Sequence, residues 1–173
     1  MQRKVDWNVW KWHAGRLQGG EKRRYAGVSH IKTENLTAEK AEEIKAYMKV
    51  KGVDISALAY YPNMLDPDEE KRRTYVEHLY RLIDASALLD VNMVTTFLGR
   101  IPNQSVSHNL EEVKKVWPPI LEYAQTKGVR IAIENCPMLF GREQWPGGHN
   151  LFTSPALWRK MFDIIPSKNF GIN

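Results

Sequence analysis

Residues 129–134 read Val-Arg-Ile-Ala-Ile-Glu, and this run sets the pattern for the whole chain. Its β-branched residues predict a strand, which Gly128 separates from a preceding helix and Pro137 brings to an end. Three more strands are expected, at Val53 to Tyr61, Val91 to Leu98 and Asn169 to Asn173. The four runs start 38 to 40 residues apart, which leaves room for a strand, a helix and two loops. The pattern predicts repeated βα units around a parallel sheet.

Longer amphipathic stretches lie between these strands. The first expected helix runs from Ala38 to Lys51, with Thr37 as its N-cap and Gly52 after its end. A second begins at Asp66-Pro67-Asp68, and a short last one is expected from Pro155 to Ile165. Between them, apolar residues recur at helical spacing over 110–124, where Pro118 and Pro119 are expected to break or kink the helix.

Two folds fit this alternation. A doubly wound open sheet can be complete with about five strands, whereas an eight-stranded barrel at this spacing needs about 300 residues. The length of 173 residues favours the open sheet, but the last expected strand runs into Asn173, as if a barrel had been cut there. Residues 1–20 carry three tryptophans in a polar setting with weak periodicity, so we expect a diverged or poorly ordered N-terminal segment. Residues 21–173 are expected to form one partial α/β domain of four to five βα units.

The net charge of the chain excludes few classes of binding partner. A formal net charge of +5 comes mostly from two short runs, residues 22–24 and 71–73, and no aromatic residues interleave with a basic stripe. Nucleic-acid binding is therefore not expected, and a phosphate group on a small substrate would satisfy the same bias.

Hydropathy and cysteine usage set the expected compartment. The apolar runs are far shorter than the roughly 20 residues of a membrane helix, and the first residues lack the apolar centre of a signal peptide. The single cysteine, Cys136, excludes an internal disulfide. A soluble cytoplasmic protein without a membrane partner is expected.

Glu134 is the first candidate for chemistry. Alternation along the strand puts Ile131 and Ile133 on one face and Ala132 and Glu134 on the other. If the isoleucines face the helices, Glu134 lies inside the barrel at the carboxyl end of its strand, where barrel enzymes place catalytic residues. The alternative is a glutamate that turns to solvent or pairs with a lysine.

Other polar residues follow the expected strands on loops at the same end. Tyr61 and Asn63 follow the first strand, and Asn135 could hold a substrate hydroxyl or orient Glu134. Arg100 is the candidate for a phosphate contact, with helix packing or a salt bridge as the alternative. His149, in the long loop from Leu139 to Thr153, could reach inward if that loop closes as a lid, and an ordered surface loop is the alternative.

Four runs resemble the sugar phosphate isomerase/epimerase family of xylose isomerase-like TIM barrels. They are residues 21–31 (EKRRYAGVSHI), 59–68 (AYYPNMLDPD), 96–100 (TFLGR) and 131–138 (IAIENCPM). The resemblance implies an incomplete (β/α)8 barrel that lacks the first βα unit and the last strands. It also implies a divalent metal (Mn, Mg, Co or Zn) held by two glutamates, an aspartate and a histidine, of which Glu134 matches the first glutamate.

The same resemblance implies that the other ligands are missing, because the run NFGIN at 169–173 would continue into an Asp-Pro-Ser-His-like segment. The complete enzyme would move a proton through an enediolate of a sugar or sugar phosphate, with Glu134 as a catalytic carboxylate. This chain would bind metal weakly and would be inactive. The alternatives are an endonuclease IV-like DNA repair barrel, and a non-catalytic partial barrel that self-associates through its open sheet edges.

Overall fold

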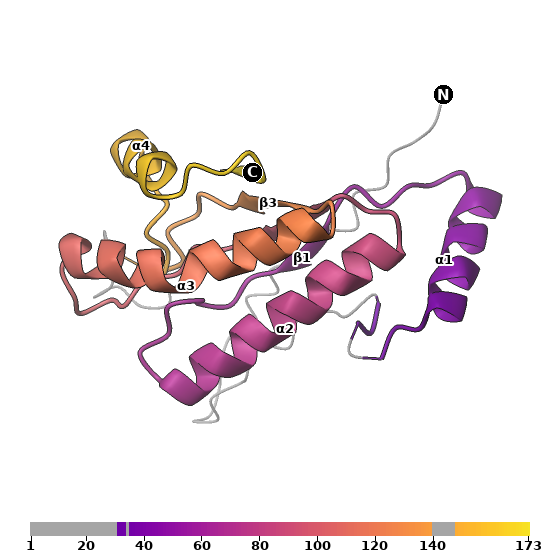
Figure 1. Ribbon diagram of the computed structural model, residues 1–173, viewed down its shortest axis with the longest axis horizontal. Coiled ribbons are helices and arrows are strands. Elements are labelled where there is room, and N and C mark those ends of the chain that lie inside the picture. Colours follow the sequence, from indigo (N-terminus) through magenta and orange to yellow (C-terminus); the bar gives the residue numbers. More distant parts are fainter. Residues whose placement is uncertain (1–30, 34, 140–147) are drawn as a thin grey trace, which may run out of the picture.

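The computed structural model describes residues 31–33, 35–139 and 148–173. In this part of the chain, four helices alternate with four strands (Figure 1). The elements are α1 (Ala38–Lys51), β1 (Leu58–Tyr60), α2 (Glu69–Leu88), β2 (Met93–Thr96), α3 (Val106–Thr126), β3 (Arg130–Ile133), α4 (Pro155–Ile164) and β4 (Phe170–Ile172). The predictions for residues 1–20, for most of the run 21–31 and for residues 140–147 lie outside the described residues.

The strands form one parallel sheet in the order β1-β2-β3-β4. Each expected strand is present, although its paired part is shorter than the sequence run that predicted it. Leu58, Val94, Ile131 and Phe170 lie side by side in the register and are all buried. The sheet is therefore the α/β arrangement expected of a partial barrel.

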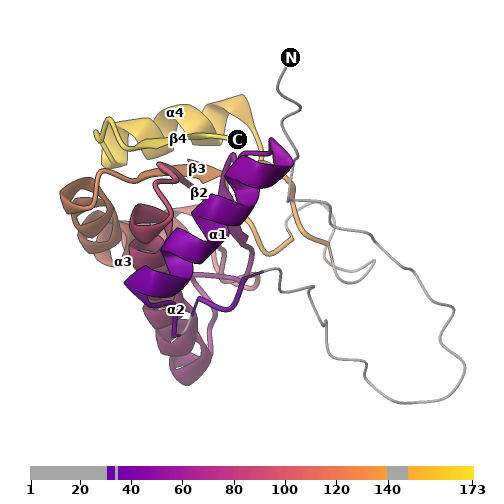
Figure 2. The ribbon, with the colours of Figure 1, turned by 90° about the vertical axis from the view of Figure 1, so that its right-hand side faces the viewer.

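The hydrophobic core lies between one face of the sheet and the helices. It includes Leu58, Val94, Ile131 and Ile133 from the strands, packed with Leu79 of α2, Trp117 of α3 and Met161 of α4. Ala59, Thr95 and Ala132, which alternate with these strand residues, are not part of that core. In Figure 2, α4 lies above the labelled strands, α3 to their left and α2 below them, and side chains of all three helices pack into the same core. A doubly wound sheet would place helices on both faces, so the arrangement is that of a barrel segment.

The ends of the helices follow the expected capping chemistry. The Thr37 hydroxyl accepts a hydrogen bond from Lys40 N at 3.2 Å, and Gly52 ends α1 with φ +62°. Asp68 caps α2 by accepting from the amides of Glu70 and Lys71. Ser154 caps α4 ahead of Pro155.

Of the two expected outcomes, a break or a kink at Pro118 and Pro119, the break does not occur, because α3 runs continuously through both prolines. A proline in a helix removes the amide that would bond to the carbonyl four residues earlier. Both prolines are exposed, as are Lys114 and Lys115, so water can satisfy those two carbonyls. Trp117 and Ile120 on the other side of α3 are fully buried and hold the helix against the sheet.

Within the described residues, none of the helices is long and apolar enough to cross a membrane.

Candidate substrate site at the carboxyl ends of the strands

A row of side chains follows the strands on the face away from the helices. Ala59, Thr95, Ala132 and Gly171 are register partners on that face. Two residues further along each strand, the same alternation reaches Tyr61, Phe97, Glu134 and Asn173. The predicted alternation around Glu134 is thus present, with Ile131 and Ile133 in the helix-facing core.

The Glu134 carboxylate is held from two sides. Oε1 accepts a hydrogen bond from the Asn135 amide at 3.1 Å, and Oε2 accepts from Asn173 Nδ2 at 3.1 Å. The main chain of Glu134 is fixed as well, because its N–H donates to Thr96 O at 2.9 Å. Both partners of the carboxylate are neutral amides. Glu134 therefore presents a negative charge at the strand ends in a fixed orientation.

An aromatic pair lies in the same row. The rings of Tyr61 and Phe97 lie 4.8 Å apart, and the Tyr61 hydroxyl lies 2.8 Å from Thr95 Oγ1. Phe97 is only 5% exposed although it is outside the main core. The pair thus places an aromatic group on the same face of the sheet as Glu134, with Phe97 buried behind the partly exposed Tyr61.

Asn63 joins the loop after β1 to the loop after β2. Its Nδ2 donates to Arg100 O at 2.7 Å, and its Oδ1 accepts from Arg100 N at 2.8 Å and from Leu65 N at 3.0 Å. Gly99, with φ +94°, lies beneath this contact. A Cβ on Gly99 would come within 2.6 Å of Asn63 Oδ1. The Asn63 amide thus orders the mouth of the site by bonding to protein atoms on both its oxygen and its nitrogen.

Two more asparagines order the loops at this end, and the sequence reading missed both. Asn150 is fully buried, and its Nδ2 donates to Glu134 O at 2.7 Å and to Cys136 O at 2.8 Å. Asn109 is also fully buried and bonds to both the N–H and the carbonyl of Ile101. Each bond joins residues far apart enough in sequence that no local motif marks it.

Arg100, His149 and Asp66 form a charged cluster at the same end of the sheet. Leu151 N donates to Gly99 O at 3.1 Å, which brings the segment around His149 next to the loop that carries Arg100. Burial lowers the pKa of His149 below its ordinary value of 6.5, the Asp66 carboxylate raises it, and the Arg100 guanidinium lowers it. Asp66 was not among the predicted site residues.

The predicted site residues therefore fall into two groups. Tyr61, Glu134 and Asn135 lie along the strand ends, with Asn135 exposed and its amide N–H on Glu134. Asn63, Arg100 and His149 lie together on the three loops that follow β1, β2 and β3. Their roles in binding stay predictions.

A divalent metal would need more ligands than these. Among residues 31–33, 35–139 and 148–173, no group of three His, Cys, Asp or Glu side chains is placed to hold a metal ion. Glu134 supplies one carboxylate, whereas Mg²⁺ or Mn²⁺ takes about six ligands. The described residues alone do not fit a tight metal site.

Comparisons with known proteins agree with this fold. A family model described as xylose isomerase-like TIM barrel matches residues 22–173. A search of curated proteins finds no match. Among solved structures, the chain is similar to 3-keto-D-glucoside 4-epimerase from E. coli, with 18% identity and a TM-score of 0.61 over 78% of this chain and 53% of that one.

Two further solved structures are similar. L-ribulose 3-epimerase is 16% identical, with a TM-score of 0.58 over 74% of this chain and 43% of that one. The IolI protein, solved with a bound zinc atom, is 15% identical, with a TM-score of 0.60 over 76% of this chain and 45% of that one. The chain thus spans about half the length of these structures. Because the family model covers most of its residues, the chain belongs to the xylose isomerase-like TIM barrel family.

Proposed function

We propose that this chain supplies the Glu134 part of a sugar isomerase or epimerase site, whose substrate is a small sugar or sugar phosphate. The observation that carries the proposal is the position of Glu134. It lies on the concave face at the carboxyl end of β3, with both carboxylate oxygens oriented by amide donors. Two similar structures are epimerases of sugars by their titles, which supports this substrate class.

Glu134 is the proposed proton-transfer group. Its carboxylate would take the proton from the carbon next to a sugar carbonyl, and the electron pair of that C–H bond would form the enediolate. Returning the proton to a different carbon or face would give the isomer or epimer. The Tyr61 ring, supported by the buried Phe97, would pack against the sugar, and Asn135 would bond to one of its hydroxyls.

Glu134 is also proposed as one ligand of a divalent metal, with the others from polypeptide outside the described residues. The zinc atom of the similar IolI structure supports metal binding in this fold. Since one carboxylate holds such an ion weakly, the chain by itself should bind metal only at millimolar concentration and should not turn over substrate. A zinc nuclease site would instead need several histidines, and the strand end at Tyr60 and Tyr61 offers none.

The test is an NMR titration of the chain with Mn²⁺, whose unpaired electrons broaden nearby signals, in the presence of a ketose. Broadening should centre on Glu134, Asn135 and Asn173, and it should disappear in Glu134→Gln. The matched control is Glu122→Gln, which removes the same charge from an exposed position of α3. Equal broadening in Glu134→Gln and the wild type would reject the proposal.

The ketose should shift the amide signals of Tyr61, Phe97 and Asn135 in the same titration. No shift there at saturating ketose, with the fold intact by circular dichroism, would also count against the site.

A further inference from the structure

We infer that Arg100, with His149 beside it, forms a binding site for an oxyanion, which would take the phosphate or carboxylate group of a charged sugar. This inference deepens the proposed function, on which it rests for the sugar itself. The site lies on the three loops that follow β1, β2 and β3, at the same end of the sheet as Glu134.

The main chain around Arg100 is held at three successive residues. Gly99 O accepts from Leu151 N at 3.1 Å. Arg100 N and O both bond to the Asn63 amide, at 2.8 and 2.7 Å. Ile101 N donates to Asn109 Oδ1 at 2.7 Å, and Ile101 O accepts from Asn109 Nδ2 at 3.1 Å. The Arg100 side chain therefore starts from a backbone that three other segments keep in place.

The guanidinium of Arg100 has a buried donor to spare. Its Nε is buried and has no hydrogen-bond partner in the part of the chain that the structure describes. A buried donor without a partner costs about 1–3 kcal/mol, which an acceptor on a ligand would recover. The planar guanidinium presents N–H groups in the geometry that phosphate and carboxylate oxygens accept in pairs.

His149 and Asp66 set the charge around that donor. The His149 segment is fixed by its own amide, which donates to Pro137 O at 3.0 Å and Met138 O at 3.1 Å. Gly148 permits this approach, because a Cβ there would lie 1.8 Å from Pro137 O. Asp66 brings one negative charge into the cluster, and its Oδ1 already accepts from Asp68 N at 2.9 Å. The Arg100 guanidinium would hold the oxyanion, and the Asp66 carboxylate, which acts on His149 together with Arg100, would limit how much negative charge the site accepts.

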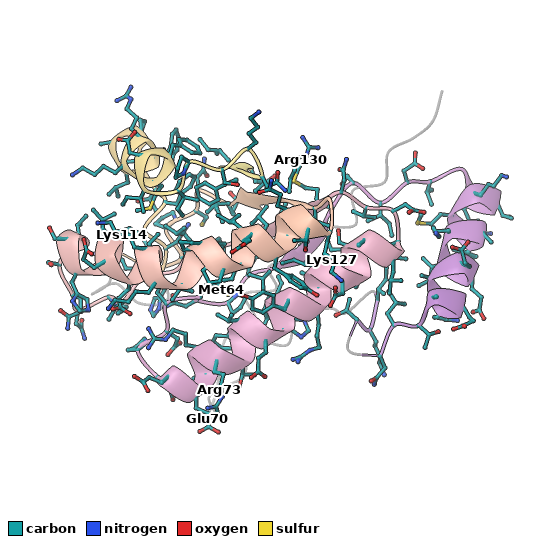
Figure 3. The ribbon with its side chains drawn as sticks, in the orientation of Figure 1. Met64, Glu70, Arg73, Lys114, Lys127 and Arg130 are labelled. Atoms are coloured by element: carbon teal, nitrogen blue, oxygen red, sulfur yellow. The ribbon has the colours of Figure 1, made fainter. Side chains whose placement is uncertain are left out.

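The binding test uses inorganic phosphate and the whole chain, measured by calorimetry and by NMR shifts. Arg100→Gln should weaken phosphate binding at least tenfold, because a charged hydrogen bond is lost. The matched control is Arg130→Gln, labelled in Figure 3, which removes the same charge from an exposed position at the opposite end of β3. That control should bind phosphate within about twofold of the wild type, since its charge is screened by distance and salt.

A second variant distinguishes a lost ligand contact from misfolding. Arg100→Lys keeps the charge but loses the planar pair of donors, so its affinity should fall between those of the wild type and Arg100→Gln. Equal phosphate affinity of Arg100→Gln and Arg130→Gln, or no phosphate binding to the wild type, would overturn the inference.

Glu134→Gln separates this inference from the proposed function. It should lose the Mn²⁺ effect and keep phosphate binding, because Glu134 is not part of the Arg100 cluster. A ketose, its phosphate ester and a sugar acid are then compared, and the tighter of the two charged ligands identifies the oxyanion. Equal affinity for the neutral ketose and both charged ligands would reject the inference and leave the role of Glu134 intact.

Discussion

The side-chain amide of Asn63 and the main chain of Arg100 exchange two hydrogen bonds, one in each direction, across 37 residues of sequence. The amide therefore donates and accepts as a backbone peptide group would, and it joins the loop after β1 to the loop after β2. Because both bonds are made at the mouth of the barrel segment, the stability of the fold and the geometry of the site depend on the same residue.

Replacing Asn63 with leucine should lower the free energy of unfolding by about 2–4 kcal/mol. The side chain has a similar size but makes neither bond, so the Arg100 N–H and carbonyl lose their partners. Urea denaturation followed by circular dichroism measures the change. Asn103→Leu is the control, because Asn103 is exposed on the loop that carries Arg100, and it should change stability by less than about 0.5 kcal/mol. Equal effects of the two variants would show that the Asn63 bonds contribute little.

Replacing Gly99 with alanine should destabilise the chain more than replacing Gly52. Both glycines have positive φ, +94° and +62°, so both substitutions strain the backbone by about 1 kcal/mol. Only at Gly99 does the new Cβ also meet protein, at 2.6 Å from Asn63 Oδ1 and from Leu65 N. Thermal unfolding of the two variants tests this difference. If Gly99→Ala melts at the same temperature as Gly52→Ala, the loops move apart without cost.

The pKa of His149 should lie below 6.5, because burial disfavours its charged form. In the unfolded chain the same imidazole binds a proton near its ordinary value. The unfolded state therefore binds more protons as the pH falls below 6.5, and the folded state loses stability there. Below the pKa of His149 in the folded state, a further fall in pH causes no additional loss of stability through this residue. NMR titration of the His149 ring, in buffer and in urea, measures both values, and a higher pKa in buffer than in urea would contradict the prediction.

Glu112 should link α2 to α3 through charge. Its carboxylate lies 2.7 Å from Lys115 Nζ and 3.1 Å from Arg72 of α2, and its side chain is 15% exposed. The hydrogen bond from Lys115 is the main cause that lowers its pKa, and the charges of Lys115 and Arg72 act in the same direction. The stabilisation is therefore present above the unfolded pKa of Glu112 and is lost as the pH falls through the folded one.

Glu112→Gln should accordingly lower the free energy of unfolding by about 1 kcal/mol at pH 7, and by less under acidic conditions. Glu111→Gln is the control, since Glu111 is 63% exposed and forms an ion pair along its own helix with Lys114. Urea denaturation at pH 7 and at acidic pH measures the free energy of unfolding of both variants. Identical losses of stability in Glu112→Gln and Glu111→Gln would mean that the pair with Arg72 adds nothing.

Local chemistry made much of the fold predictable. The bounds of α1, its Thr37 cap and its Gly52 end follow from side chains that act within one turn of the helix. The short apolar runs and their regular spacing located all four strands, and alternation along β3 identified the face that Glu134 occupies. The helix does not break at Pro118 and Pro119, because the exposed side of α3 tolerates lost backbone bonds while its other side is buried.

The contacts between loops were not predictable in the same way. Asn150 bonds to the Glu134 carbonyl across 16 residues, and nothing near Asn150 in the sequence distinguishes it from an asparagine exposed to water. Asp66 was read as the start of a helix, and only the folded chain brings its charge to His149. Partners of this kind depend on how the loops meet, which local patterns do not encode.

The order of the sheet has a consequence for how the protein is made. Within the described residues, each strand pairs only with strands adjacent to it in chain order, so the sheet can grow by one unit at a time as the polypeptide leaves the ribosome. Asn173, which orients Glu134, belongs to the last of these units. Glu134 is therefore synthesised about one unit before Asn173, so its Oε1 can accept from the neighbouring Asn135 amide at once, whereas its Oε2 gains the Asn173 donor when β4 docks.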